Sequence, residues 1–120
     1  MDIHEVKERI ETLYAENGSY FEIIKEENES WAECFKRNNF TDDEIVFLKE
    51  LVSDEWEGTE IKTESFAEKL CSFYNYYLEL WESKQVFDSC GLDIFVMNFI
   101  IVDNSTNEKV LSGLNVYKRY

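Results

Sequence analysis

Residues 94–102 of the chain read IFVMNFIIV, and in these nine positions only Asn98 is polar. The run is far shorter than the ~20 apolar residues that a membrane-spanning helix needs. Its content of β-branched and aromatic residues is typical of a β-strand buried on both faces. We therefore expect this strand to lie at the centre of the fold, with the rest of the chain covering it.

The sequence after this strand predicts a β-hairpin. The polar cluster DNSTNE at 103–108 has the composition of a turn. Residues 110–117 then return as a second strand, in which Gly113 is a candidate β-bulge. A strand that is apolar on both faces needs another neighbour as well. Three earlier segments are candidates for that neighbour: 20–24, 60–62 and 86–87.

Two helix starts are clear in the first half of the chain. Asp2 and Glu5 have the spacing of residues whose side chains cap free backbone N–H groups, and they begin a predicted helix over 3–16. The sequence TDDE at 41–44 has the same spacing and begins a second helix over 42–56. Apolar residues recur at three- and four-residue steps in both segments, as an amphipathic helix requires.

Further helices are predicted with less distinctive patterns. Ser65 and Glu68 have the capping spacing, and a wide apolar stripe follows them, so a helix is expected over 66–83. Capping pairs also indicate two short helices within 20–37, although 20–24 fits an edge strand equally well. The predicted fold class is α+β, a single globular domain over 1–120. In it, three to four N-terminal helices pack on a small C-terminal antiparallel sheet centred on a β-hairpin of about 93–102 and 110–117.

Composition excludes several classes of protein. The chain is 44% hydrophobic and 16% aromatic, which is too apolar for a disordered acidic tail. Its three cysteines, at 34, 71 and 90, have the spacing of neither a disulfide framework nor a zinc site. The first residues, MDIHE, do not resemble a signal peptide, so a cytoplasmic location is expected.

The sequence does not predict an enzyme. With one histidine and four scattered glycines, it offers no metal site, no His-assisted triad and no phosphate-binding loop. Carboxylate pairs occur throughout so acidic a chain, so none of them is informative. We expect no catalytic residues, no metal and no cofactor.

Charge is the feature that argues for a kind of partner. The net charge is −14, and 18 acidic and 6 basic residues lie in 1–60 against 8 and 6 in 61–120. Such a field repels nucleic acids and anionic membranes and attracts basic protein surfaces. The sequence therefore predicts a basic protein partner, with no direct binding to nucleic acid or membrane. An acidic surface that only keeps the protein soluble is the simpler alternative.

Two segments are candidates for the contact surface. The first surrounds an aromatic residue with carboxylates at the end of the predicted helix over 42–56, where the helix dipole disfavours negative charge: Asp54, Glu55, Trp56, Glu57 and Glu60. An exposed aromatic side chain would anchor a partner, and the acids would steer its approach. The alternative is that Trp56 packs in the core. The second candidate is a polar break with the acids Glu26, Glu27 and Glu29.

In size, charge and lack of a catalytic motif, the chain resembles immunity proteins and antitoxins that neutralise a basic toxin, and phage-encoded inhibitors of nucleic-acid-handling host defences. This resemblance implies a stoichiometric inhibitor of a toxin or effector. One alternative is a decoy that imitates DNA in the groove of a nuclease. Another is a structural or adaptor domain that self-associates through an aromatic helix edge, formed by Tyr74, Tyr76, Tyr77 and Trp81. A monomer or a weak homodimer is expected.

Overall fold

The computed structural model describes residues 1–17, 22–52, 58–87 and 93–118, with the side chains of all of these except 17, 82–87, 93–95 and 115–118. The chain is an α+β protein, as predicted. Its elements in order are α1 (Ile3–Asn17), β1 (Glu22–Ile24), α2 (Trp31–Arg37), α3 (Asp42–Leu48), the 3₁₀ turn η1 (Lys49–Leu51), β2 (Glu60–Lys62), α4 (Thr63–Phe73), β3 (Tyr76–Phe87), β4 (Asp93–Asp103) and β5 (Lys109–Lys118).

The main sheet is an antiparallel meander in the order β3–β4–β5, so the predicted hairpin and its central strand are confirmed. Ile101 of β4 lies opposite both Leu78 of β3 and Val110 of β5. The turn between β4 and β5 is held by Asp103, whose carboxylate accepts backbone bonds from Ser105 (2.8 Å) and Thr106 (3.2 Å).

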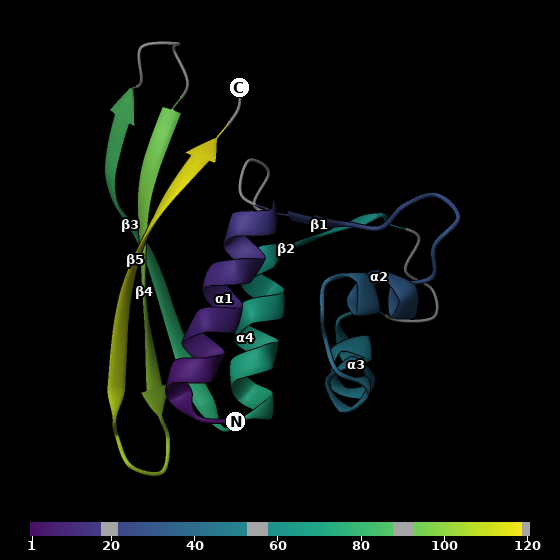
Figure 1. Ribbon diagram of the computed structural model, residues 1–120, viewed down its shortest axis with the longest axis horizontal. Coiled ribbons are helices and arrows are strands. Elements are labelled where there is room, and N and C mark those ends of the chain that lie inside the picture. The colour runs from purple at the N-terminus through teal and green to yellow at the C-terminus, as the bar shows by residue number, and fades with distance from the viewer. Residues whose placement is uncertain (18–21, 53–57, 88–92, 119–120) are drawn as a thin grey trace.

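Helices cover one face of this sheet. Figure 1 shows α1 and α4 side by side against it, with α2 and α3 beyond α4 and every helix on the same side. Alternate residues of the strands point at the helices and are buried, among them Leu78, Phe99, Ile101 and Val110. These residues and the apolar stripes of α1 and α4, which include Val6, Ile10, Phe66 and Leu70, form the core.

The opposite face of the sheet corrects the expectation that the central strand is buried on both sides. Ile100 and Val102 of β4 point away from the helices and stay partly exposed. Their neighbours on that face, Tyr77 and Leu111, are exposed. No helix that the structure describes packs there, so the described residues cover the central strand on one side only.

The predicted helix over 66–83 is wrong at both ends. Helix α4 begins at Thr63 and ends at Phe73, and β3 begins three residues later. Between them Asn75 has a left-handed φ of 63°, a conformation that ends helices and that asparagine tolerates better than most residues. From Tyr76 to Trp81 buried and exposed residues alternate, which is the period of a strand.

A second, two-stranded sheet joins distant parts of the chain. Strands β1 and β2 pair antiparallel with Ile23 opposite Ile61. Two of the candidate neighbours of β4 therefore pair with each other, while the third, 86–87, belongs to β3 and does pair with β4. The strand alternative for 20–24 is correct over the three residues of β1. In this strand the side chain of Ile23 is buried.

Side-chain caps are confirmed at the starts of α1 and α3 but not at α4, whose N-cap is Lys62 with no side-chain bond, so Ser65 and Glu68 lie inside that helix. Asp2 and Glu5 bond each other's backbone N–H groups (3.4 and 2.9 Å) at the start of α1, which runs one residue past the predicted 3–16. Thr41 and Glu44 form the predicted capping box of α3. That helix is shorter than the predicted 42–56, since it ends at Leu48 and continues only as η1.

Gly113 is not a bulge. The pairing of β4 with β5 runs through it without a shift, and the irregularity of the sheet falls between residues 82 and 84 of β3. A side-chain carbon at Gly113 would stand 2.9 Å from Oδ1 of Asn98, its cross-strand neighbour. A residue larger than glycine here would therefore need the end of the Asn98 side chain to move.

Candidate functional site

Only part of the predicted contact surface can be placed. Asp54, Glu55, Trp56 and Glu57 lie outside the described residues. Glu60 is exposed at the start of β2, and Glu26 and Glu27 are exposed in the loop after β1. Three of the predicted carboxylates are therefore accessible to a partner.

The pairing of β1 with β2 brings the two candidate segments together. Ile24 at the end of β1 lies opposite Glu60 at the start of β2. One residue further along, the backbone N–H of Lys25 donates to the carbonyl of Thr59 (2.7 Å). The loop that carries Glu26 and Glu27 therefore follows β1 at the same end of the two-stranded sheet where β2 starts with Glu60. We call Ile24, Glu26, Glu27 and Glu60 the acidic end of the two-stranded sheet.

Glu29 differs from the other acids because its charge is already paired. Arg37 of α2 donates to both of its carboxylate oxygens (2.9 Å each) and to the carbonyl of Ile24 (2.8 Å). Bonds from Arg37 lower the pKa of Glu29 to about 2. The side chain is only 12% exposed, so Glu29 fixes the loop to α2 rather than presenting a free carboxylate.

The same end carries an apolar residue that the sequence reading missed. Ile24 is 44% exposed, whereas its neighbour Ile23 is fully buried. Once 22–24 is known to be a strand, the two-residue period requires one of the two isoleucines to point outward. A helix-or-strand ambiguity at 20–24 concealed this signal.

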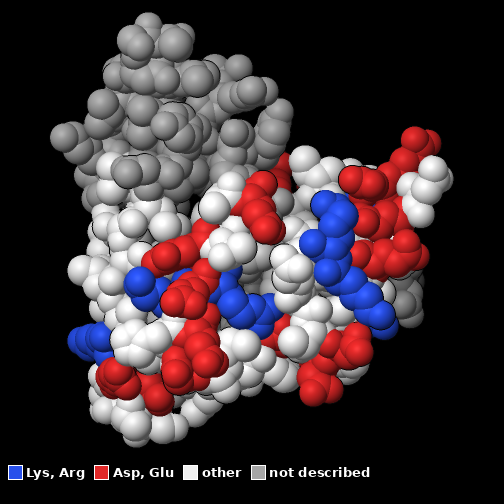
Figure 2. All heavy atoms as spheres, viewed as in Figure 1, with Lys and Arg blue, Asp and Glu red and all other residues white. Residues whose placement is uncertain are grey.

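Acidic side chains are not confined to this end of the molecule. Figure 2 shows them over α1, on the left of the view, and around α2 and α3, on the right, with lysines and arginines between them. Exposed examples are Glu5, Glu8 and Glu16 on α1 and Asp42 and Asp43 on α3. The two aspartates are accounted for by the N-terminal turn of α3, where the helix dipole favours negative charge.

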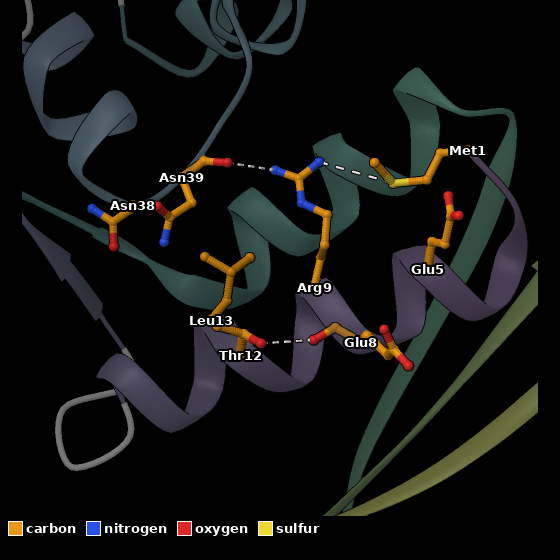
Figure 3. A pocket seen from close by; sticks show the side chains of 8 residues that line it. All are labelled: Met1, Glu5, Glu8, Arg9, Thr12, Leu13, Asn38 and Asn39. Carbon is orange, nitrogen blue, oxygen red and sulfur yellow. Dashed lines mark hydrogen bonds between the residues drawn. The ribbon is translucent and has the colours of Figure 1, made fainter.

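A cleft of about 350 Å³ lies between α1 and the connection from α2 to α3 (Figure 3). Its lining residues are Met1, Glu5, Glu8, Arg9, Thr12, Leu13, Asn38 and Asn39. The Arg9 guanidinium faces it but is already bonded, to the carbonyl of Asn39 (3.2 Å) and to the carboxylate of Glu44. The cleft therefore offers a ligand no free cation from Arg9.

Glu44 shows why Arg9 is held in that position. Its side chain is 1% exposed and also accepts bonds from the Tyr74 hydroxyl (2.5 Å) and the Thr41 backbone (2.9 Å). Burial raises the pKa of Glu44, but the bonds from Arg9 and Tyr74 outweigh it, and the pKa lies below its ordinary value. This network ties α1, α3 and the end of α4 together, so its role is structural.

The predicted aromatic edge is divided between two environments. Tyr74 is half-buried against Glu44, and Tyr76 is buried with its hydroxyl donating to the carbonyl of Met1 (2.9 Å). Tyr77 and Trp81 are exposed on the face of the sheet that no described helix covers. The four residues therefore do not form one surface.

Among the described residues, no cluster of histidine, cysteine and carboxylate side chains is arranged to hold a metal ion. Within the same residues, no helix is both long and apolar enough to cross a bilayer. No protein-family model matches the chain, and comparison with curated proteins and with solved structures gave no significant match. The function must therefore be argued from the chain's own residues.

Proposed function

We propose that this protein is a small inhibitor that binds a basic protein partner, such as a toxin or a nucleic-acid-handling effector, through the acidic end of its two-stranded sheet. One observation carries the proposal. Two acidic segments far apart in sequence are joined at one place by the pairing of Ile24 with Glu60.

The arrangement suits recognition of a cationic surface. Exposed carboxylates at Glu26, Glu27 and Glu60 raise the rate of encounter with a basic partner, because opposite charges attract over a Debye length of ~8 Å at physiological salt. Ile24 supplies exposed apolar area at the same end of the sheet, and contact of that kind slows dissociation. The Glu29–Arg37 pair holds the loop in place, which reduces the entropy lost on binding.

The experiment is capture of partners from the protein's own cells with the full chain, followed by association kinetics with the partner that is recovered. We expect a partner with an excess of lysine and arginine, and an association rate that falls at least about tenfold between roughly 0.05 and 0.5 M salt. Recovery of acidic or neutral partners alone would contradict the proposal.

A matched pair of double variants tests the assignment of the surface. Glu26→Lys with Glu27→Lys reverses two exposed charges at the acidic end, and Glu8→Lys with Glu16→Lys reverses two exposed charges on α1. Both variants change the net charge equally. We expect the first to slow association about tenfold and the second about twofold or less. Equal losses would show that only the overall field matters and that the acidic end is not the contact surface.

Competition with duplex DNA separates the inhibitor from the decoy that imitates DNA. A decoy occupies the partner's nucleic-acid groove, so excess duplex displaces it. We expect the complex to persist in excess duplex DNA at constant ionic strength, since an inhibitor bound elsewhere on the partner does not share that groove.

A further inference from the structure

The uncovered face of the three-stranded sheet is an exposed apolar feature that the fold leaves unexplained. Its described side chains include Tyr77, Trp81 and Leu111, which are 53%, 43% and 63% exposed. Ile100 and Val102 lie between them on the central strand. We call these five residues the open face.

Apart from Asn98, the described part of the central strand is apolar on both sides, although the described residues cover only one of them. Phe99 and Ile101 are fully buried against the helices, while Ile100 and Val102 alternate with them on the open face. A strand with this pattern is normally found between two layers. No helix among the described residues supplies a second layer on this side, which leaves the face open to another molecule.

The charges on the open side favour a second copy of this chain as the molecule that covers it. The described charged residues on the open side are Glu79 on β3 and Lys109 on β5, one of each sign on the two edge strands. The described part of the open side is therefore close to neutral on a protein whose net charge is −14. A basic partner would gain little here, whereas two acidic molecules can approach through this side with the least repulsion.

The positions of the two charges also fit a second copy. A two-fold axis parallel to β4 places β3 of one copy over β5 of the other at the same level along the strands. Glu79 is level with Ile100 and Leu111, and Lys109 is two residues from Leu111, a spacing of about 7 Å along a strand. Glu79 of each copy then lies within reach of Lys109 of the other, so the ion pair forms twice.

We propose that the open face joins two copies of this chain into a symmetric dimer, with the two three-stranded sheets packed face to face. Sheets pack in this way ~10 Å apart, at an angle of about 30°. The described part of the face covers five residues of each strand, roughly 17 Å, and three strands span roughly 14 Å, so each copy presents on the order of 250 Å² in plan. The total of about 500 Å² is smaller than the ~1,000 Å² of a stable specific interface, which predicts a weak, reversible dimer.

Sedimentation equilibrium of the full chain tests the dimer. We expect a monomer–dimer equilibrium below about 100 µM chain that strengthens as salt is raised from roughly 0.05 to 0.5 M, because salt screens the repulsion between two acidic molecules. Capture of a basic partner should weaken over the same range. A wild-type chain that stays monomeric in all these conditions overturns the dimer and leaves the open face to a different protein.

An exposed residue elsewhere supplies the matched control. Leu111→Glu places a charge in the middle of the interface and should raise the dimer dissociation constant at least about tenfold. Val46, which is 70% exposed on α3, is a similar apolar residue away from the sheet, and Val46→Glu should leave the constant unchanged. Circular dichroism of both variants checks that each one folds. Equal effects of the two substitutions overturn the assignment to the open face.

A charge swap tests the two-fold arrangement itself. Glu79→Lys and Lys109→Glu change the net charge in opposite directions, so an effect of net charge alone would strengthen one dimer and weaken the other. The proposed pairing predicts that each single variant weakens the dimer about threefold or more, and that the double variant returns it to near the wild-type constant. Failure of the double variant to restore the dimer rules out this geometry.

Discussion

Glu44 is the residue on which the packing of three helices depends. Its carboxylate is almost completely buried at the junction of α1, α3 and α4, and Arg9 supplies the opposing charge. A buried ion pair is rarely worth much compared with apolar packing, yet removal of one partner is costly because the other charge is left unpaired.

Replacement of Arg9 should therefore be far more damaging than replacement of a surface lysine. We predict that Arg9→Met lowers the free energy of unfolding by about 3 kcal/mol at neutral pH. Lys7 pairs with the half-exposed Glu11 on the same helix, so Lys7→Met should cost about 0.5 kcal/mol or less. Urea denaturation of the two variants measures both values. Similar losses would show that the Glu44 network contributes no more than a surface pair.

The pH dependence of this loss has a definite sign. The pKa of Glu44 is lowered in the folded protein, so its pairing stabilises the fold above the ordinary carboxyl pKa of 4.5. That contribution is lost as the pH falls through the folded-state pKa. The difference between wild type and Arg9→Met should therefore shrink in acid, and a difference that grew in acid would contradict the assignment.

At the scale of elements, the sequence predicted the features that depend only on residues close together in the chain. Caps at Asp2 and Thr41 identified the starts of α1 and α3, since each cap and its partner lie three residues apart, whereas Ser65 and Glu68, with the same spacing, do not begin α4. The apolar run at 94–102 identified β4 from composition alone. These signals needed no knowledge of the rest of the fold.

The elements that were wrong depend on tertiary contacts. Residues 74–81 are rich in tyrosine and leucine and fit a helical stripe, but pairing with β4 selects the strand. Strands β1 and β2 have three residues each, too few for a periodic signal, so their pairing could not be predicted. For the same reason both acidic segments were identified separately, while their meeting at Ile24 and Glu60 was not.

Gly113 allows a test of strand pairing, because the space for a larger residue at this position is limited by one neighbouring side chain, that of Asn98. A methyl group there meets Asn98 at 2.9 Å, so we predict that Gly113→Ala destabilises the fold by about 1 kcal/mol. In an Asn98→Ala background the same change should be neutral or stabilising, since alanine suits a strand better than glycine. Thermal denaturation of the two single variants and the double variant measures this coupling. Additive effects would contradict it.

At the scale of the whole molecule, the acidic end and the open face lie on different sheets. The acidic end lies on the two-stranded sheet, and the open face lies on the outer side of the three-stranded sheet, away from the helices. Binding at the first should weaken with salt and binding at the second should strengthen. A single protein can therefore be dimeric and still present the acidic end of each copy, and the two activities can be separated by ionic strength.

The pairing of β1 with β2 also has a consequence for the order of folding. The β3–β4–β5 meander is built from neighbouring segments, whereas β1 and β2 close a long loop that contains α2 and α3. Loop closure costs entropy before any contact compensates for it, so this pairing is expected to form late and to open first.

Native-state hydrogen exchange would register that order. Amides of β1 and β2 should exchange through partial opening, at a lower free energy than those at the centre of β4, which should require global unfolding. Equal protection of the two sheets would mean that the chain folds and unfolds as one cooperative unit. Lower protection of β1 and β2 would mean that the segment carrying the acidic end detaches while the meander stays folded.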